Sequence, residues 1–112
     1  MNSEKYLNQE LDIVIDRPVG PKHPRYNYIY PVNYGYVPGT VSGDGEELDA
    51  YLLGVVRPEE TYHGKCIAII HRTNDDDDKL IVTPLDIDFT DEQIESQVNF
   101  QEKYFKHVLI RK

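Results

Sequence analysis

Carboxylates gather in a turn in the middle of the chain, where the sequence reads SGDGEELDAYLLG. Asp44, Glu46 and Asp49 fall within this turn and lead into the apolar run Ala50–Leu53, which predicts a buried strand. Carboxylates that converge at a strand end repel one another unless a cation lies between them. The spacing therefore predicts a hard-metal site, set against the alternative of a solvated turn, since Asp and Gly also dominate ordinary turns.

A second acidic run, Asp75–Asp78, precedes another apolar stretch, Lys79–Pro84, which also predicts a strand. If the two strands are neighbours, Asp44, Asp49 and Asp77 share one pocket. Oxygen ligands favour Mg²⁺, Mn²⁺ or Ca²⁺ over zinc, and no Cys/His spacing in the chain suits zinc. An acidic run alone is more often a solvated loop, so the prediction depends on the two strands being adjacent.

Tyrosines precede the acidic turn in the segment YPVNYGY. Their usual role is core packing with the hydroxyl at the surface, and their functional alternative is hydrogen-bond donation to a phosphate oxygen. Tyr34 is the best candidate, because we expect the neighbouring Gly35 to leave room for a ligand. The cations that could contact an anion are Lys22, Arg25, Lys103 and Lys106.

Size and charge narrow the function classes. At 112 residues the chain predicts one domain, residues 1–112. Its 20 acidic and 12 basic residues, a net charge of −8, argue against nucleic-acid binding and against adhesion to an anionic membrane. The lone cysteine, Cys66, is expected in the core, and the absence of an apolar leader or membrane span predicts a cytoplasmic protein.

The remaining elements predict a mainly β (α+β) fold. Thr90 and Gln93 form a capping-box pattern at the start of a helix expected to run to Tyr104, with Ile94 and Val98 on one face. Several short strands with this one helix indicate a small Greek-key barrel with a packed C-terminal helix. We expect strands at Leu11–Asp16, Leu48–Val56, Lys65–His71, Lys79–Pro84 and Lys106–Ile110, and a loop at Pro58–Gly64.

Together these residues resemble the family I soluble inorganic pyrophosphatases. The resemblance is carried by YPVNYGYVPGT followed by DGEELDAYLLG, and more weakly by DDDKLIVTP and QEKYFK, from about Leu11 to Lys106. It implies an OB-like barrel that hydrolyses pyrophosphate to phosphate with several Mg²⁺ ions, for which Mn²⁺ is the alternative. The substrate would then be a small-molecule phosphate, and we also expect a homo-oligomer.

The resemblance also implies roles for individual residues. Glu46 falls on the aspartate that activates the attacking water, and Asp44 and Tyr34 accompany it in catalysis. Tyr34 and Tyr104 fall on tyrosines that contact phosphate. The implied metal ligands are Asp16, Asp44, Asp49 and Asp77.

Two departures from the family pattern bear on the substrate. Glu46 stands where the family has an aspartate, and the hairpin that normally supplies a phosphate-binding lysine and arginine is missing. We expect Arg25 and Lys22 to substitute for it, with Lys106 closing the pocket from the other side. The alternatives are hydrolysis of another phosphoanhydride or nucleotide, or a non-catalytic metal- or phosphate-binding homologue.

Overall fold

The computed structural model describes residues 2–20, 29–42, 45–75 and 77–111. Within these residues lie a short 3₁₀ helix, six strands and one α-helix, none of the helices long and apolar enough to cross a membrane. In chain order the elements are η1 (Asn2–Tyr6), β1 (Glu10–Arg17), β2 (Asn33–Val37), β3 (Leu48–Leu52), β4 (Thr61–Arg72), β5 (Asp78–Thr83), α1 (Asp91–Glu102) and β6 (His107–Ile110).

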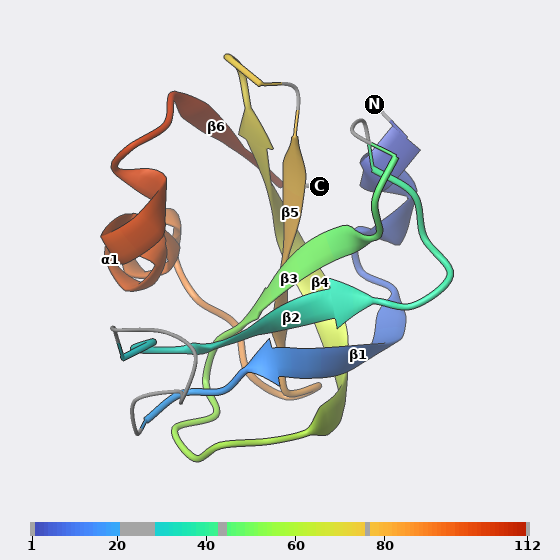
Figure 1. The fold of residues 1–112 in the computed structure, drawn as a ribbon, viewed down its shortest axis with the longest axis vertical. Coiled ribbons are helices and arrows are strands. Elements are labelled where there is room, and N and C mark those ends of the chain that lie inside the picture. The colour runs from blue at the N-terminus through green and yellow to red at the C-terminus, as the bar shows by residue number, and fades with distance from the viewer. Residues whose placement is uncertain (1, 21–28, 43–44, 76, 112) are drawn as a thin grey trace.

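Five strands close into a barrel, drawn in Figure 1. They follow the order β1-β2-β3-β5-β4, and β4 pairs back with β1, while β6 extends the sheet beyond β4. The neighbours β3 and β5 are parallel, and the other pairs are antiparallel. The predicted barrel with one packed helix is confirmed, and the adjacency of β3 and β5 is the condition that the two acidic segments required.

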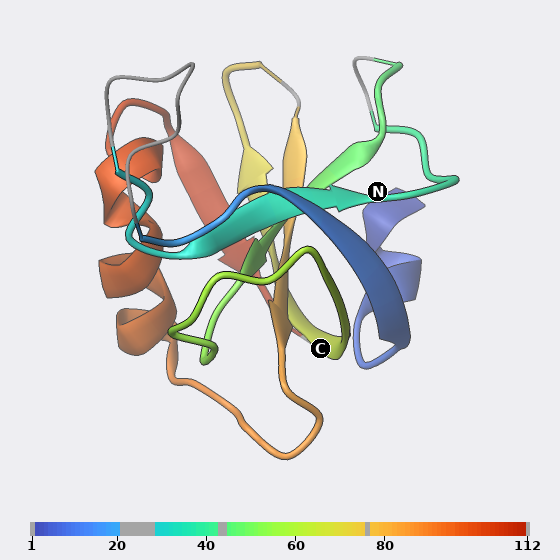
Figure 2. The same ribbon diagram turned by 60° about the horizontal axis from the view of Figure 1, so that its bottom comes forward.

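Alternate residues of the strands feed two hydrophobic cores. In β3, Ala50 and Leu52 belong to the core that also contains Ile13, Cys66 and Leu80. Tyr51 and Leu53 point the other way, into a second core with Ile94 and Val98 of α1. Helix α1 therefore covers one outer face of the sheet, as Figures 1 and 2 show.

The loops that connect the strands lie at two opposite ends of the barrel. The β4–β5 hairpin and the described parts of the β2–β3 loop lie at one end, and the β3–β4 and β5–α1 connections lie at the other (Figure 2). The two acidic segments predicted from the sequence thus occupy the same end of the barrel.

Helix α1 begins where its capping box predicts. The Gln93 amide donates to Thr90 Oγ1 at 3.2 Å, and the Thr90 amide donates to Gln93 Oε1 at 2.9 Å. Its buried face consists of Ile94, Val98 and Glu102, spaced four residues apart. The carboxylate of Glu102 is thereby brought beneath the sheet.

The largest differences from the sequence prediction concern the start of β4, the end of β3 and the N-terminal helix η1. The predicted loop at Pro58–Gly64 is wrong from Thr61 onward, because β4 starts there and pairs with β1 to close the barrel. A Cβ on Gly64 would lie 2.5 Å from the Thr83 carbonyl oxygen, so the glycine lets β5 approach closely. Strand β3 was predicted to reach Val56 but ends at Leu52, before Gly54 at φ +89°. The helix η1 was not predicted from the sequence.

Cys66 is fully buried in β4, which confirms the predicted core role. Burial raises the pKa of its thiol to about 12, so the thiol stays protonated at neutral pH.

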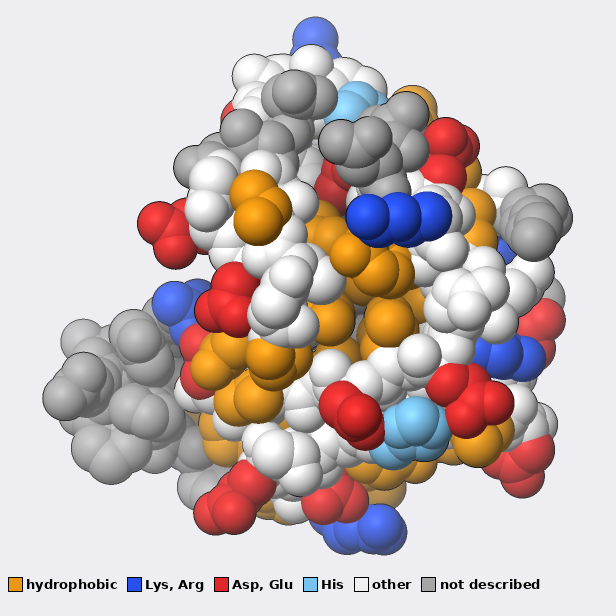
Figure 3. Space-filling view, turned by 90° about the vertical axis from the view of Figure 1, so that its right-hand side faces the viewer, with side chains coloured by type: hydrophobic (Ala, Val, Ile, Leu, Met, Phe, Trp, Pro, Cys, Tyr) orange, Lys and Arg blue, Asp and Glu red, His pale blue; other side chains and the backbone are white. Residues whose placement is uncertain are grey.

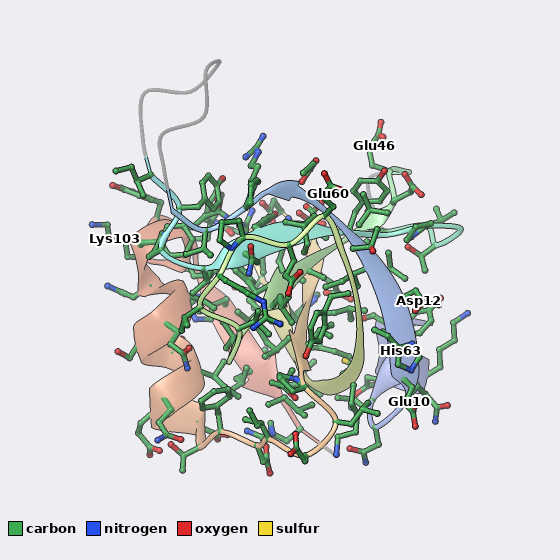
Figure 4. The ribbon with its side chains drawn as sticks, turned by 90° about the horizontal axis from the view of Figure 1, so that it is seen from below. Glu10, Asp12, Glu46, Glu60, His63 and Lys103 are labelled. Carbon is green, nitrogen blue, oxygen red and sulfur yellow. The ribbon has the colours of Figure 1, made fainter. Side chains whose placement is uncertain are left out.

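A histidine joins the two strands that close the barrel. His63 of β4 lies 2.8 Å from Asp12 Oδ1 through Nδ1 and 2.9 Å from Glu10 Oε1 through Nε2 (Figure 4). Carboxylates only accept hydrogen bonds, so both bonds form only when the imidazole is protonated.

On the face toward the N-terminal segment, seen in Figure 3, charged side chains surround a central group of hydrophobic ones.

We expect this contact to make stability depend weakly on pH. Hydrogen bonds to Glu10 and then to Asp12 raise the pKa of His63. A raised folded-state pKa stabilises below the unfolded value, about 6.5, and the contribution is lost as pH rises through the folded value. His63→Gln should remove this part of the pH dependence of thermal unfolding. An unchanged profile in the variant would show that the contact contributes nothing.

Candidate active site

A lysine joins the two acidic segments at the barrel end. Lys79 Nζ lies 2.5 Å from Asp49 Oδ2 and 2.6 Å from Asp77 Oδ2. Asp49 and Lys79 are paired residues of the parallel strands β3 and β5, so the sheet register itself sets this contact. The lysine side chain is only 4% exposed, which makes the ammonium a built-in counter-ion between the two carboxylates.

A second buried cation, Arg72 at the end of β4, continues the cluster inward. Its Nε and Nη2 donate to the two carboxylate oxygens of Glu102 at 3.0 and 2.8 Å. Its Nη1 lies 3.6 Å from Asp75 and 3.9 Å from Asp77. The guanidinium also stacks 3.6 Å from the centre of the Phe105 ring, which fixes its plane.

The bond with Arg72 decides the charge of Glu102. Burial alone would raise the pKa of Glu102, but hydrogen bonds from Arg72 and Tyr51 outweigh it and hold the pKa below its usual value. Glu102 is therefore ionised at neutral pH although it is fully buried.

At the outer end of the cluster, the charge of Asp49 acts on the carboxyl of Asp16 in β1. Asp16 lies at the irregularity of β1 between the residues that pair with Gly35 and Tyr34. Burial raises the pKa of the Asp16 carboxyl, Arg17 lowers it, and the negative charge of Asp49 raises it further. The negative charge of Asp49 thus acts on the Asp16 carboxyl, and negative potential of this kind attracts a cation.

Two tyrosines, Tyr34 and Tyr51, lie between the carboxylate cluster and α1. The Tyr34 ring packs edge-on against the Tyr51 ring, with their centroids 4.9 Å apart. The Tyr51 hydroxyl donates to Glu102 Oε2 at 2.5 Å and accepts from Gln101 Nε2 at 2.7 Å. Burial first, and then the adjacent carboxylates, raise the pKa of both phenols, so both stay neutral donors.

The expectation that Gly35 leaves room for a ligand beside Tyr34 is wrong. A Cβ on Gly35 would lie 1.8 Å from the carbonyl oxygen of Val14. The missing side chain makes room for the backbone of β1, which crosses β2 at this point. Tyr34 is itself only 7% exposed, so its side chain is part of the packed interior.

Gly35→Ala should therefore act on the fold. We expect a loss of about 2–3 kcal/mol in the free energy of unfolding, because a strand backbone has to move. Gly39→Ala is the matched control: its φ of +81° costs about 1 kcal/mol, but no atom lies within 4 Å of the new Cβ. Chemical denaturation measures both, and equal losses would contradict the close packing of β1 on Gly35.

The other predicted residues are spread around this cluster or fall outside the described residues. Asp44, Lys22 and Arg25 lie outside them, so their roles stay predictions. Glu46 is exposed in the β2–β3 loop and lies on the side of the molecule opposite Lys103 (Figure 4). Tyr104 is 74% exposed, and no described contact joins it to the carboxylates.

Lys106 adjoins the β4–β5 hairpin through its backbone. Its carbonyl oxygen accepts from the Thr73 amide at 2.9 Å, while its side chain is exposed. The segment that follows α1 is thus fixed beside the hairpin that carries Asp77.

The donor chemistry of the cluster fits a hard divalent cation at its outer end. Asp16 and Asp49 offer carboxylate oxygens, the ligands that Mg²⁺ prefers, with no His or Cys beside them among the described contacts. Within the described ranges no group of three His, Cys, Asp or Glu is arranged to hold a metal, so a complete ligand set requires Asp44 or a substrate. Asp77 lies between two cations, which favours a counter-ion role for it over direct ligation.

Sequence reasoning missed four residues of this site: Arg72, Lys79, Gln101 and Glu102. A signal existed for two of them. Glu102 continues the buried four-residue spacing of Ile94 and Val98, and Lys79 lies in β5, whose residues are all buried. No periodicity marks Arg72 or Gln101, because their partners come from elements distant in the chain.

The fold and site define a small closed barrel with a carboxylate cluster at one end. A sequence model of one family, described as inorganic pyrophosphatase, matches residues 7–109. The chain therefore belongs to the inorganic pyrophosphatase family, a class of hydrolases that act on phosphoanhydride bonds and use divalent metal ions.

Curated relatives match locally. Inorganic pyrophosphatase 1 of Pseudomonas syringae pv. tomato is 36% identical over 61 residues, 51% of this chain and 35% of the relative. An inorganic pyrophosphatase of Helicobacter pylori strain 26695 is 33% identical over the same shares of the two chains. The matched stretch thus covers about a third of these relatives.

Solved structures match over most of the chain. The inorganic pyrophosphatase of Ehrlichia chaffeensis aligns with a TM-score of 0.68 at 17% identity, over 94% of this chain and 87% of that one. The enzyme of Helicobacter pylori aligns with a TM-score of 0.62 at 20% identity, over 91% and 82%. At this identity the likeness establishes the fold, an OB-like barrel.

Proposed function

We propose that this chain hydrolyses inorganic pyrophosphate to phosphate with Mg²⁺ as cofactor, for which Mn²⁺ is the alternative. Family membership supports the reaction, and the observation that carries it to this chain is the cluster at the barrel end. There Asp49 and Asp77 both pair with the buried ammonium of Lys79, which supports the proposal. The substrate class is a small-molecule phosphate.

The metal and its ligands form the first part of the proposal. Asp49 and Asp16, together with Asp44, hold the divalent cation, and Asp77 supports them through Lys79. A divalent cation bound there would neutralise substrate charge and lower the pKa of a water bound to it.

The chain's other groups orient the substrate and move the proton. Lys79 and Arg72 face the anion as fixed positive charges, and we retain Tyr34 as a catalytic residue of the proposal. Glu46 takes the proton of the attacking water from the β2–β3 loop. We retain Arg25, Lys22, Tyr104 and Lys106 as substrate contacts of the proposal.

Glu46→Gln tests the proposed base. Removing a general base should lower kcat for Mg²⁺–pyrophosphate about 100-fold and leave KM within about threefold, because the amide keeps the shape and loses the proton acceptor. Glu60→Gln, which changes another exposed carboxylate labelled in Figure 4, is the matched control and should keep wild-type rates. Equal falls in kcat and in affinity would assign Glu46 to structure.

A substrate panel tests the reaction itself. Phosphate release is measured with Mg²⁺ and either pyrophosphate, a nucleoside triphosphate, a nucleoside diphosphate or a sugar diphosphate. The proposal predicts a kcat/KM for pyrophosphate at least about 100-fold above the others. Faster release from a nucleotide would favour the second enzyme reading, hydrolysis of an organic diphosphate.

A non-catalytic role has one observation in its favour. Lys79 and Arg72 already compensate Asp77 and Glu102, so the inner part of the cluster is stable without a metal. Pyrophosphate binding without phosphate release in the panel would support that role. Self-association and a cytoplasmic location complete the proposal, and light scattering of the purified chain tests the former.

A further inference from the structure

One carboxylate holds two of the three nitrogen atoms of the Arg72 guanidinium. Arg72 Nε donates to Glu102 Oε1 at 3.0 Å, and Nη2 donates to Oε2 at 2.8 Å. Glu102 is fully buried, and its Oε2 also accepts from the Tyr51 hydroxyl at 2.5 Å. The centre of the Phe105 ring lies 3.6 Å from the guanidinium carbon, so the ring covers one face of the planar group. The position and the orientation of the guanidinium are therefore both fixed.

The third nitrogen, Nη1, makes none of the hydrogen bonds that Arg72 forms among the described residues. The carboxylates that pair with it, Asp75 Oδ2 at 3.6 Å and Asp77 Oδ2 at 3.9 Å, lie beyond hydrogen-bond distance. Arg72 is only 6% exposed, yet no buried side-chain nitrogen or oxygen in the described ranges lacks a hydrogen-bond partner. Nη1 is therefore the atom through which this otherwise buried cation meets the solvent.

Both of these carboxylates have closer partners than Nη1. Asp77 Oδ2 lies 2.6 Å from Lys79 Nζ, and Asp75 Oδ1 accepts from the Asp77 amide at 3.2 Å. Lys79 Nζ in turn lies 2.5 Å from Asp49 Oδ2, so Nη1 lies at the inner edge of the carboxylate cluster. The protons of Nη1 are thus left for an acceptor that the described part of the chain does not supply.

A phosphoryl oxygen fits this position by its chemistry. Guanidinium groups form charge-assisted hydrogen bonds with phosphate oxygens, which are shorter and stronger than bonds between neutral groups. The nearby carboxylates repel an anion, and the ammonium of Lys79 between Asp49 and Asp77 offsets part of that repulsion. A fixed guanidinium also binds without first losing side-chain freedom.

We propose that Glu102 is a positioning residue for anion binding: by holding Nε and Nη2 of Arg72, it presents Nη1 to a phosphoryl oxygen at the barrel end. Arg72 is then the group that touches the anion, and Glu102 acts through it. That the phosphoryl oxygen belongs to a diphosphate substrate rests on the proposed function; the geometry of Glu102 and Arg72 does not.

Glu102→Gln tests the positioning role at constant shape. An amide has one acceptor oxygen, so its NH₂ group would face an N–H of Arg72, and one of the two bonds is lost. Calorimetry measures the Kd for methylenediphosphonate with Mg²⁺, a diphosphate analogue whose P–C–P bridge water does not cleave. Binding should weaken about 10-fold, the loss of one hydrogen bond to a charged group, while the Kd for Mn²⁺ alone stays within about twofold.

The matched control is Glu95→Gln, which neutralises another carboxylate of α1 that accepts from a side chain, here His107 Nε2 at 2.7 Å. It should keep the wild-type Kd for the diphosphonate. In pyrophosphate hydrolysis, Glu102→Gln should raise KM about 10-fold and leave kcat within about threefold, because an anion contact acts on bound substrate and transition state alike. A folded Glu102→Gln protein with the wild-type diphosphonate Kd would overturn the inference.

A double variant shows whether Glu102 acts through Arg72. Arg72→Lys keeps the positive charge but loses the planar fork and Nη1, so it should also weaken diphosphonate binding about 10-fold. Glu102 then has nothing left to orient, and the double variant should bind no more weakly than the worse single variant. Effects of the two substitutions that multiply would overturn the inference.

Nitrogen-15 NMR of the wild-type guanidinium needs no variant that could fail to fold. The Arg72 signals are assigned through their contact with the Phe105 ring. Bound diphosphonate should shift the Nη1 signal more than the Nε signal, which stays with Glu102. Equal shifts, no shift, or a wild-type chain that binds no diphosphonate would overturn the inference.

These measurements separate the inference from the proposed function. If pyrophosphate is bound but not hydrolysed, the proposed function fails, and the calorimetry and NMR with diphosphonate still decide the role of Glu102. If hydrolysis proceeds and Glu102→Gln changes neither KM nor the diphosphonate Kd, the proposed function stands and the inference fails.

Discussion

Asp49→Asn should lower the rate of pyrophosphate hydrolysis roughly 100- to 1,000-fold, the loss seen when one electrostatic group is removed from an active site. Asp49 Oδ2 lies 2.5 Å from Lys79 Nζ, and the charge of Asp49 raises the pKa of both Tyr34 and Asp16. Asparagine keeps the shape and one acceptor oxygen but loses the charge. Affinity for Mg²⁺ and Mn²⁺, measured by calorimetry without substrate, should fall with the rate.

The control for Asp49→Asn is Asp86→Asn, which changes an exposed carboxylate in the β5–α1 connection. It should leave both the rate and the metal affinity at wild-type values. Circular dichroism should show the same fold in both variants, because Asp77 still pairs with Lys79 when Asp49 is neutral. An Asp49→Asn protein with wild-type metal affinity would remove Asp49 from the ligand set.

Lys79→Met should cause the largest loss of stability, about 3–5 kcal/mol in the free energy of unfolding. Methionine fills the volume of the lysine stem, so the cost comes from leaving the carboxylates of Asp49 and Asp77 without their shared ammonium. Asp49 is 39% exposed, which places the expected value near the lower end of that range.

The control for Lys79→Met is Lys103→Met, at an exposed lysine after α1, which should change stability by less than about 0.5 kcal/mol. Chemical denaturation measures the free energy of unfolding of both variants. A Lys79→Met protein as stable as Lys103→Met would contradict the counter-ion role of Lys79.

The parts of the fold set by local pattern were predictable from the sequence. The capping box at Thr90 located the start of α1, and the apolar runs located β1, β3, β5 and β6 to within a few residues. Strand β4 was predicted too short, because Thr61–Gly64 owe their strand conformation to pairing with the distant β1. Glycine suggested a loop at Gly64, whereas it serves close contact between strands.

The site was predictable as a list of acids and less so as a network. The adjacency of Asp49 and Asp77 followed from placing both at the ends of neighbouring strands. The counter-ion Arg72 and the amide of Gln101 could not be placed, because their partners come from elements distant in the chain. Composition shows only that cations are outnumbered, and it does not show which ones are buried.

The most direct test of the account is ³¹P NMR of Mg²⁺–pyrophosphate incubated with the wild-type chain in ¹⁸O-labelled water. The account predicts conversion of the pyrophosphate signal to phosphate, with one ¹⁸O atom in one of the two phosphates from each pyrophosphate, because water is the attacking group. Chelation of the metal should stop the conversion. A pyrophosphate signal that persists unchanged in the presence of Mg²⁺ and the folded chain would contradict the account.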